Sequence, residues 1–216
     1  MLYFLASRRG RPRPTAGPPY AGTNQEVSAL SAPKTTNPTA AASPTDPEGP
    51  TGRLASWLAE TSVEQIPREV RERAVHLLLD GLGCALIGAQ LPWSRIAAGA
   101  VLDLEGEGPV PVIGWGRTTS GPAAAVLNGT FIQGFELDDY YAPAPVHSTS
   151  LVIPALLSTV FRAGGPVISG ARFLQAVVSG FETGTRVGLA LHGPEMLSRG
   201  LSLSVMIELM VGPCLS

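Results

Sequence analysis

The sequence predicts a mainly α-helical domain that begins near residue 51. Apolar residues recur at helical spacing through most of residues 51–191, and glycine and proline separate these runs. Only one short segment is rich in β-branched residues. A hydrophobic fraction of 44% is enough for a real core. We therefore expect one domain of helices with short connections, preceded by a tail.

The tail, residues 1–50, has a different composition. It holds nine of the twenty prolines and many small or polar residues, so it cannot bury enough surface to offset chain entropy and is predicted to be disordered. Its first residues are apolar and then arginine-rich, with no acid before Glu26. This pattern fits a transit peptide or an ordinary tail. We expect a mitochondrial or a cytoplasmic location.

Charge and residue usage exclude several function classes. A net charge of −2 gives no electrostatic case for nucleic acid. No apolar run approaches the ~20 residues that span a bilayer, so no membrane partner is expected. Two distant cysteines fit a reducing compartment, and neither Cys-x-x-Cys nor His-x-x-x-His spacing occurs. We therefore expect no metal site built from this chain alone.

Helix signals divide residues 51–105 into three helices. Thr51 is a candidate cap for the first, and Pro67 fits the first turn of the second. Ser94 is a candidate cap for the third, which should end near Glu105. Three glycines, which are unfavourable inside a helix, fall in the second helix and predict close approach of neighbouring helices: Gly81, Gly83 and Gly88.

The rest of the chain predicts one extended segment and three further helices. Residues 109–116 are short, apolar and bounded by glycine, as in a strand. The fourth helix opens at Pro122 and should deliver Glu136, Asp138 and Asp139 at its C-terminal end. The fifth runs from Ser148 to Arg162, with Pro154 marking a kink or a late start, and the sixth from Ser169 to Leu191.

The segment between the fourth and fifth helices carries the candidate chemistry. Asp138 and Asp139 precede a proline-containing loop, and His147 stands just before the fifth helix, with Ser148 as a candidate cap. Carboxylates and a histidine meeting across a rigid loop suit proton transfer. The alternative is a solvated helix end followed by a surface loop.

Helix electrostatics predict opposite pKa shifts on the two sides of this loop. The positive end of a helix should lower the pKa of His147, whereas a negative helix end and mutual repulsion should raise a carboxyl pKa at Asp138 or Asp139. Adjacent helical residues point about 100° apart, so one aspartate should face a pocket. We favour Asp138 as pocket-facing or Asp139 as orienting the loop. Arg186 could clamp a substrate carboxylate or be a surface arginine.

In order and spacing, the motifs together resemble the MmgE/PrpD family, which includes 2-methylcitrate dehydratase and cis-aconitate decarboxylase. The resemblance covers roughly residues 53–200. It rests on segments spread along this range: residues 66–67, 74–84, 112–114, 121–125, 128–133, 136–140, 147–148, 180–182 and 186–188. The Leu-Asp-Asp-Tyr and Ala-Pro-x-His-Ser forms are most similar to the fungal cis-aconitate decarboxylase branch.

This resemblance implies the N-terminal part of an all-helical domain, which in the family is joined to a smaller α/β lid in a homodimer. It implies lyase chemistry on a small tricarboxylate, as a decarboxylase or a dehydratase, without a metal or organic cofactor. The site residues it implies are catalytic Asp138, Asp139 and His147, and substrate-binding Tyr140, Ser148 and Arg186.

Two departures from the family pattern limit this expectation. Tyr141 stands where relatives commonly have a histidine, and residues 201–216 diverge. The lid and a downstream lysine are expected to be absent, since Lys34 is the sole lysine. We therefore expect a C-terminally truncated chain with little or no activity of its own. The alternative function is a non-catalytic helical fragment that pairs with a full-length relative.

Overall fold

The computed structural model describes residues 46–162, 164–165, 167–191, 195 and 198. It places helix α1 (Pro50–Glu60) in one compact unit and the chain from Thr61 onward in another. The prediction of a mainly α-helical protein is confirmed. Thr51 was predicted to cap the first helix. Because α1 begins at Pro50, Thr51 lies inside the helix and does not cap it.

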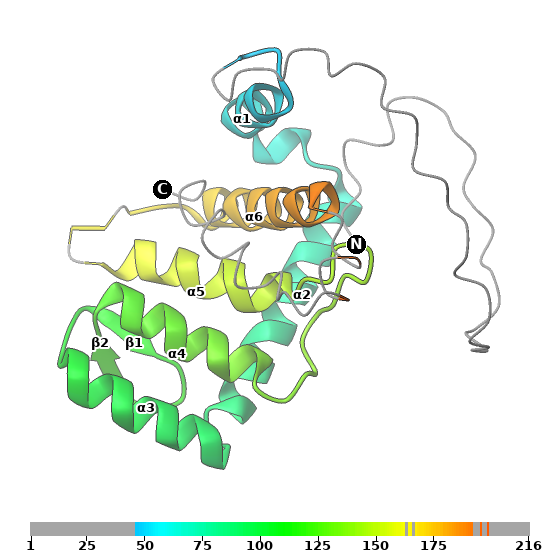
Figure 1. The fold of residues 1–216 in the computed structure, drawn as a ribbon. Coiled ribbons are helices and arrows are strands. Elements are labelled where there is room, and N and C mark those ends of the chain that lie inside the picture. The colour runs from blue at the N-terminus through cyan, green and yellow to red at the C-terminus, as the bar shows by residue number, and fades with distance from the viewer. Residues whose placement is uncertain (1–45, 163, 166, 192–194, 196–197, 199–216) are drawn as a thin grey trace, which may run out of the picture. The chain divides into compact units, whose positions relative to one another are not determined.

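From Thr61 to Leu191, the structure describes five long helices and one short one. Helices α3, α4, α5 and α6 lie side by side in chain order, and α2 crosses them (Figure 1). Helix α2 contacts α4, α5 and α6, while α4 contacts α3 and α5. The elements are a 3-10 turn (Val63–Gln65), α2 (Arg68–Gly88), α3 (Pro92–Glu105), α4 (Gly121–Gln133), α5 (Ser148–Phe161) and α6 (Gly170–Ala190).

A small hairpin fills the connection between α3 and α4. Strand β1 (Val110–Val112) pairs antiparallel with β2 (Arg117–Thr119), so the segment predicted as one extended run is half of a hairpin. Both turn glycines adopt positive φ, which glycine tolerates without strain. Buried Asn128 of α4 holds the hairpin against this helix. Its Oδ1 accepts a hydrogen bond from the Ile113 amide, and its Nδ2 donates one to the Pro111 carbonyl.

Helix α3 begins earlier than predicted, whereas α5 begins at Ser148 as predicted. Leu91 precedes the first turn of α3, so Ser94 is inside the helix and fully buried, and it does not cap. Proline suits this first turn because its missing N–H has no partner there. Pro154 lies inside α5, which already begins at Ser148, so it does not mark a late start. Helix α6 begins at the predicted boundary, where the Ser169 side chain caps it by accepting a hydrogen bond from the Arg172 amide.

The glycines of α2 have different surroundings. A Cβ on Gly81 would meet Thr149 of α5, and one on Gly88 would lie 1.8 Å from the Phe131 carbonyl oxygen of α4. Both glycines therefore permit the close helix approach that was predicted. A Cβ on Gly83 would meet none of the described residues within 4 Å, so that glycine faces open space with respect to them.

No single helix of the described ranges is long and apolar enough to cross a membrane. Only α2 and α3 taken together, which meet at 87°, satisfy length and composition. The predictions for the tail up to residue 45 and for residues 201–216 lie outside the described residues.

Candidate active site

The candidate site is built on the connection between α4 and α5. Helix α4 ends at Gln133, with Gly134 as its C-cap, and Glu136 adopts a positive φ of 58°. Asp138 and Asp139 were predicted at the C-terminal end of this helix. They lie instead in the loop beyond it. A non-glycine residue at positive φ is uncommon and marks a sharply redirected backbone.

This loop is anchored in the hydrophobic core. Ala144 and Val146 are fully buried and Tyr141 nearly so, and all three join the cluster formed by α2, α5 and α6. The Tyr141 amide donates to the Val146 carbonyl at 2.9 Å, which closes the turn. The alternative of a solvated surface loop is therefore wrong, because core packing fixes both ends of the turn that leads into His147.

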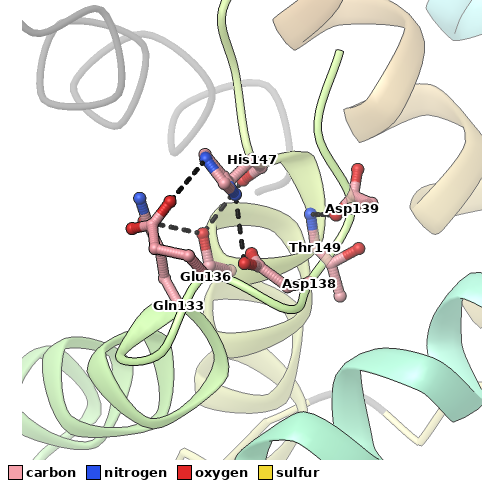
Figure 2. A network of polar contacts seen from close by, with 7 residues as sticks. Gln133, Glu136, Asp138, Asp139, His147 and Thr149 are labelled. Carbon is pink, nitrogen blue, oxygen red and sulfur yellow. Dashed lines mark hydrogen bonds and ion pairs between the residues drawn. The ribbon is translucent and has the colours of Figure 1, made fainter.

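His147 lies between two carboxylates (Figure 2). Its Nδ1 is 3.0 Å from Oδ1 of Asp138, and its Nε2 is 3.4 Å from Oε2 of Glu136. The Asp138 side chain is fully buried, whereas that of Glu136 is 70% exposed. With Asp138 ionised, Nδ1–H donates to it, and Nε2 is left as a proton acceptor on the exposed side.

Burial raises the pKa of Asp138 to about 6, and the nearby His147 opposes this rise. The direction agrees with the prediction, but the main cause is loss of solvent and not a helix end. Repulsion from Asp139 is a smaller cause. One oxygen of Asp138, Oδ2, is buried with no hydrogen-bond partner among the described residues, which adds to the difficulty of ionising this group. Asp138 thus gains or loses its charge near neutral pH.

Asp139 points to the other side of the loop (Figure 2). Its Oδ1 accepts a hydrogen bond of 2.7 Å from the Thr149 amide in the first turn of α5. A carboxylate here satisfies one of the free amides at a helix N-terminus and suits the partial positive charge there. Asp139 therefore positions α5 from outside, while His147 occupies the N-cap without capping through its side chain.

Two hollows flank the loop. A small pocket of about 70 Å³ lies on the Asp139 side, and a wider depression of about 610 Å³ lies on the Glu136 side. Within the described part of the chain, the only charged residue that lines the wide depression is Glu136. The small pocket is lined by residues of α2, the loop, α5 and α6: Arg73, Leu77, Asp139, Tyr140, Tyr141, Ser148, Phe181 and Thr185.

The structure brings most of the predicted site residues together. The Tyr140 ring lies 5.0 Å from the His147 ring, centroid to centroid, and Tyr140 and Ser148 both line the small pocket. Arg186 does not line it. Its Nη2 lies 3.0 Å from Oε2 of buried Glu182, an ion pair that was not among the predicted alternatives. The substrate-binding roles stay predictions.

Two nearby residues were not among the predicted site residues. Glu136 contacts His147, and the signal was present, since Glu136 belongs to the same acidic run. Arg73 lines the pocket from α2, and nothing in its local pattern of alternating charges distinguishes it from exposed neighbours. Within the described residues, no group of three or more His, Cys, Asp or Glu side chains is arranged to hold a metal ion.

Comparison with known proteins decides the family. The MmgE/PrpD N-terminal domain matches residues 52–208, which extends beyond the expected limit near residue 200. The chain belongs to the MmgE/PrpD family. This assigns the helices α2 to α6 and the loop that carries Asp138, Asp139 and His147 to the N-terminal domain of that family.

Two MmgE/PrpD relatives come from Aspergillus. The chain is 50% identical over 159 residues to the cis-aconitate decarboxylase-like protein oryM of Aspergillus oryzae, covering 71% of this chain and 33% of that protein. It is 42% identical over 154 residues to cis-aconitate decarboxylase of Aspergillus terreus, covering 70% and 31%. The chain spans about a third of the length of these relatives.

Proposed function

We propose that this chain carries the N-terminal part of a lyase active site that acts on a small tricarboxylate, with cis-aconitate decarboxylation as the first candidate reaction. The observation that carries the proposal is the buried Asp138 carboxylate 3.0 Å from Nδ1 of His147. A buried partner fixes the orientation of an imidazole and leaves its other nitrogen for proton transfer. The named relative from Aspergillus terreus supports cis-aconitate as the substrate.

In a decarboxylation, the bond between carbon and one carboxylate breaks and releases CO₂. The electron pair stays on the carbon skeleton, and one proton must be supplied to it, which converts cis-aconitate to itaconate. His147 in its protonated form would donate this proton from Nε2, the atom that faces the exposed side of the loop. Asp138 would stabilise the imidazolium that exists before the transfer.

Dehydration of 2-methylcitrate is the second candidate reaction at the same residues. A base removes a proton next to a carboxylate, and an acid protonates the departing hydroxyl. Nε2 of neutral His147 would serve as the base. Because the same two residues suit either reaction, the choice depends on the substrate that the assay selects.

We expect the 216-residue chain alone to have little or no turnover. Ligand pockets commonly occupy about 300–1,000 Å³, whereas the pocket on the Asp139 side of the loop, lined by Tyr140 and Ser148, holds about 70 Å³. Relatives more than twice as long have further residues that could complete such a site.

The test is a chimera in which residues 53–200 replace the matching third of the Aspergillus terreus enzyme. We expect it to form itaconate and CO₂ from cis-aconitate, measured by NMR and by CO₂ release. A folded chimera that neither releases CO₂ from cis-aconitate nor dehydrates 2-methylcitrate would overturn the proposal.

The exposed face of α2 favours a second candidate function, pairing with a full-length relative. Val75, Leu79, Leu82 and Leu86 follow one helical stripe and are 48%, 70%, 39% and 56% exposed. Gly83 lies within this stripe with open space before it, so another helix could approach closely. An apolar stripe of this kind is typical of an interaction surface. In full-length members of the family, where a homodimer is expected, this surface is the candidate contact.

Copurification with the Aspergillus terreus enzyme tests this pairing. Leu79→Glu should abolish it, because a charge would be buried in the contact. Leu104→Glu is the matched control, since Leu104 of α3 is 85% exposed and lies off the stripe. Copurification that is equal for wild type and Leu79→Glu, or absent for wild type, would contradict the pairing.

A further inference from the structure

The small pocket beside the His147 loop has features that point to a ligand group of one kind. It has room for about 70 Å³, which suits a single functional group and not a whole tricarboxylate. It lies against Tyr140, whose ring also contacts the His147 ring. Tyr140 therefore connects this pocket to the His147 ring.

Ser148 supplies an unused hydrogen-bond donor in this pocket. It is the first residue of α5, its side chain lines the pocket, and it is only 3% exposed. Its hydroxyl has no hydrogen-bond partner among the described residues. A buried hydroxyl without a partner is unfavourable, so an acceptor in the pocket would satisfy it.

The charges around the pocket favour an anionic acceptor. Arg73 reaches it from α2 with a permanently charged guanidinium, and this arginine forms no salt bridge within the described part of the chain. The N-terminus of α5 adds partial positive charge at Ser148. Asp139 is the opposing charge, and its Oδ1 accepts a hydrogen bond from the Thr149 amide. Among the residues that the structure describes, Glu136 is the only charged one that lines the wide depression on the other side, and none of them offers a cation to an anion.

We propose that this pocket binds one carboxylate of the small polycarboxylate substrate, with Ser148 Oγ donating a hydrogen bond and Arg73 supplying the countercharge. The proposal rests on the proposed function and names the residues that hold the end of the substrate that does not react. Arg73 takes here the role that the sequence suggested for Arg186, whose guanidinium is paired with Glu182.

The test uses the full 216-residue chain and tricarballylate, a saturated tricarboxylate that cannot react. Binding is followed by chemical-shift changes in amide NMR spectra. Ser148→Ala and Arg73→Gln should each raise the dissociation constant about tenfold or more. Each variant removes a hydrogen bond or an ion pair to a carboxylate, and such interactions are charge-assisted. The shift changes in wild type should be centred on the first turn of α5.

Matched controls are available for both variants. Ser94→Ala removes another buried hydroxyl without a partner, on α3 and away from the pocket. Arg68→Gln removes an exposed arginine from the same helix, paired with Glu72. Neither control should change the dissociation constant by more than about twofold.

Three results would overturn the subsite: no binding of tricarballylate by wild type at millimolar concentration, equal binding by wild type and both pocket variants, or equal weakening by the controls. Failure of the proposed function is a separate result. An inactive chimera with intact, Ser148-dependent tricarballylate binding would refute the lyase and leave the subsite standing. An active chimera together with tricarballylate binding that does not depend on Arg73 would support the lyase and refute the subsite.

Discussion

The Asp138 carboxylate lies 3.0 Å from Nδ1 of His147, and its side chain is fully buried while that of His147 is 11% exposed. A carboxyl group in such a place is easier to bury neutral than ionised. The imidazole offsets part of this cost, and the pKa of Asp138 still rises to about 6. Asp138 therefore lowers stability above that pH while it prepares His147 for proton transfer.

Replacing Asp138 should separate these two effects. The folded protein holds the Asp138 proton more tightly than the unfolded chain does between about pH 4 and pH 6, so stability falls as pH rises through this window. Asp138→Asn keeps the neutral shape and should raise the free energy of unfolding by up to about 3 kcal/mol at about pH 8, with little change near pH 4. Urea unfolding at both pH values measures this. Asp103→Asn, at an exposed position of α3, is the control. A loss of stability in Asp138→Asn at about pH 8 would contradict the account.

Replacing Asp139 tests its role at the start of α5. Asp139→Ala removes the acceptor of the Thr149 amide and should lower the free energy of unfolding by about 0.5–2 kcal/mol. Asp139→Asn should keep most of the stability of the wild type, because asparagine is an equally good acceptor at a helix N-terminus. Thermal unfolding followed by circular dichroism provides the comparison. If alanine and asparagine behave alike, the hydrogen bond is not what stabilises α5.

The two glycines Gly88 and Gly83 form a matched pair on α2. Gly88→Ala would place a Cβ 1.8 Å from the Phe131 carbonyl oxygen, so the backbone of α4 must shift, at a cost of about 1–3 kcal/mol. Gly83→Ala meets nothing and should gain up to about 1 kcal/mol from helix propensity. Urea unfolding of both variants decides this. A stabilising Gly88→Ala would show that α2 and α4 are not packed as described.

The pH dependence of turnover should follow Asp138. Ionised Asp138 accepts Nδ1–H of His147, so a dehydration that uses Nε2 as base should speed up as pH rises through about 6. Steady-state rates of the chimera across this range measure the rising limb. Asp138→Asn should remove that limb, whereas Ser94→Ala should keep it. A profile that is unchanged in Asp138→Asn would assign the limb to another group.

The sequence was sufficient for the helices and for the site segment, because apolar spacing and proline-glycine boundaries are local signals. It placed the aspartates at a helix end because nothing local showed that Gly134 would end α4. The second strand was missed because the alternation of Arg117–Thr119 is too short to stand out. Arg73 could not be found locally, since its place depends on how α2 and the loop pack. The Glu182–Arg186 pair has i,i+4 spacing within α6, so that local signal was present in the sequence.

The central claim is that His147, held by Asp138, transfers the proton in a lyase reaction, and the most direct measurement is turnover of the chimera carrying His147→Ala. We expect its kcat for cis-aconitate to fall by about 100-fold or more, with folding preserved by circular dichroism, while Ser94→Ala retains the parent rate. A folded His147→Ala chimera that turns over at the parent rate would contradict the claim.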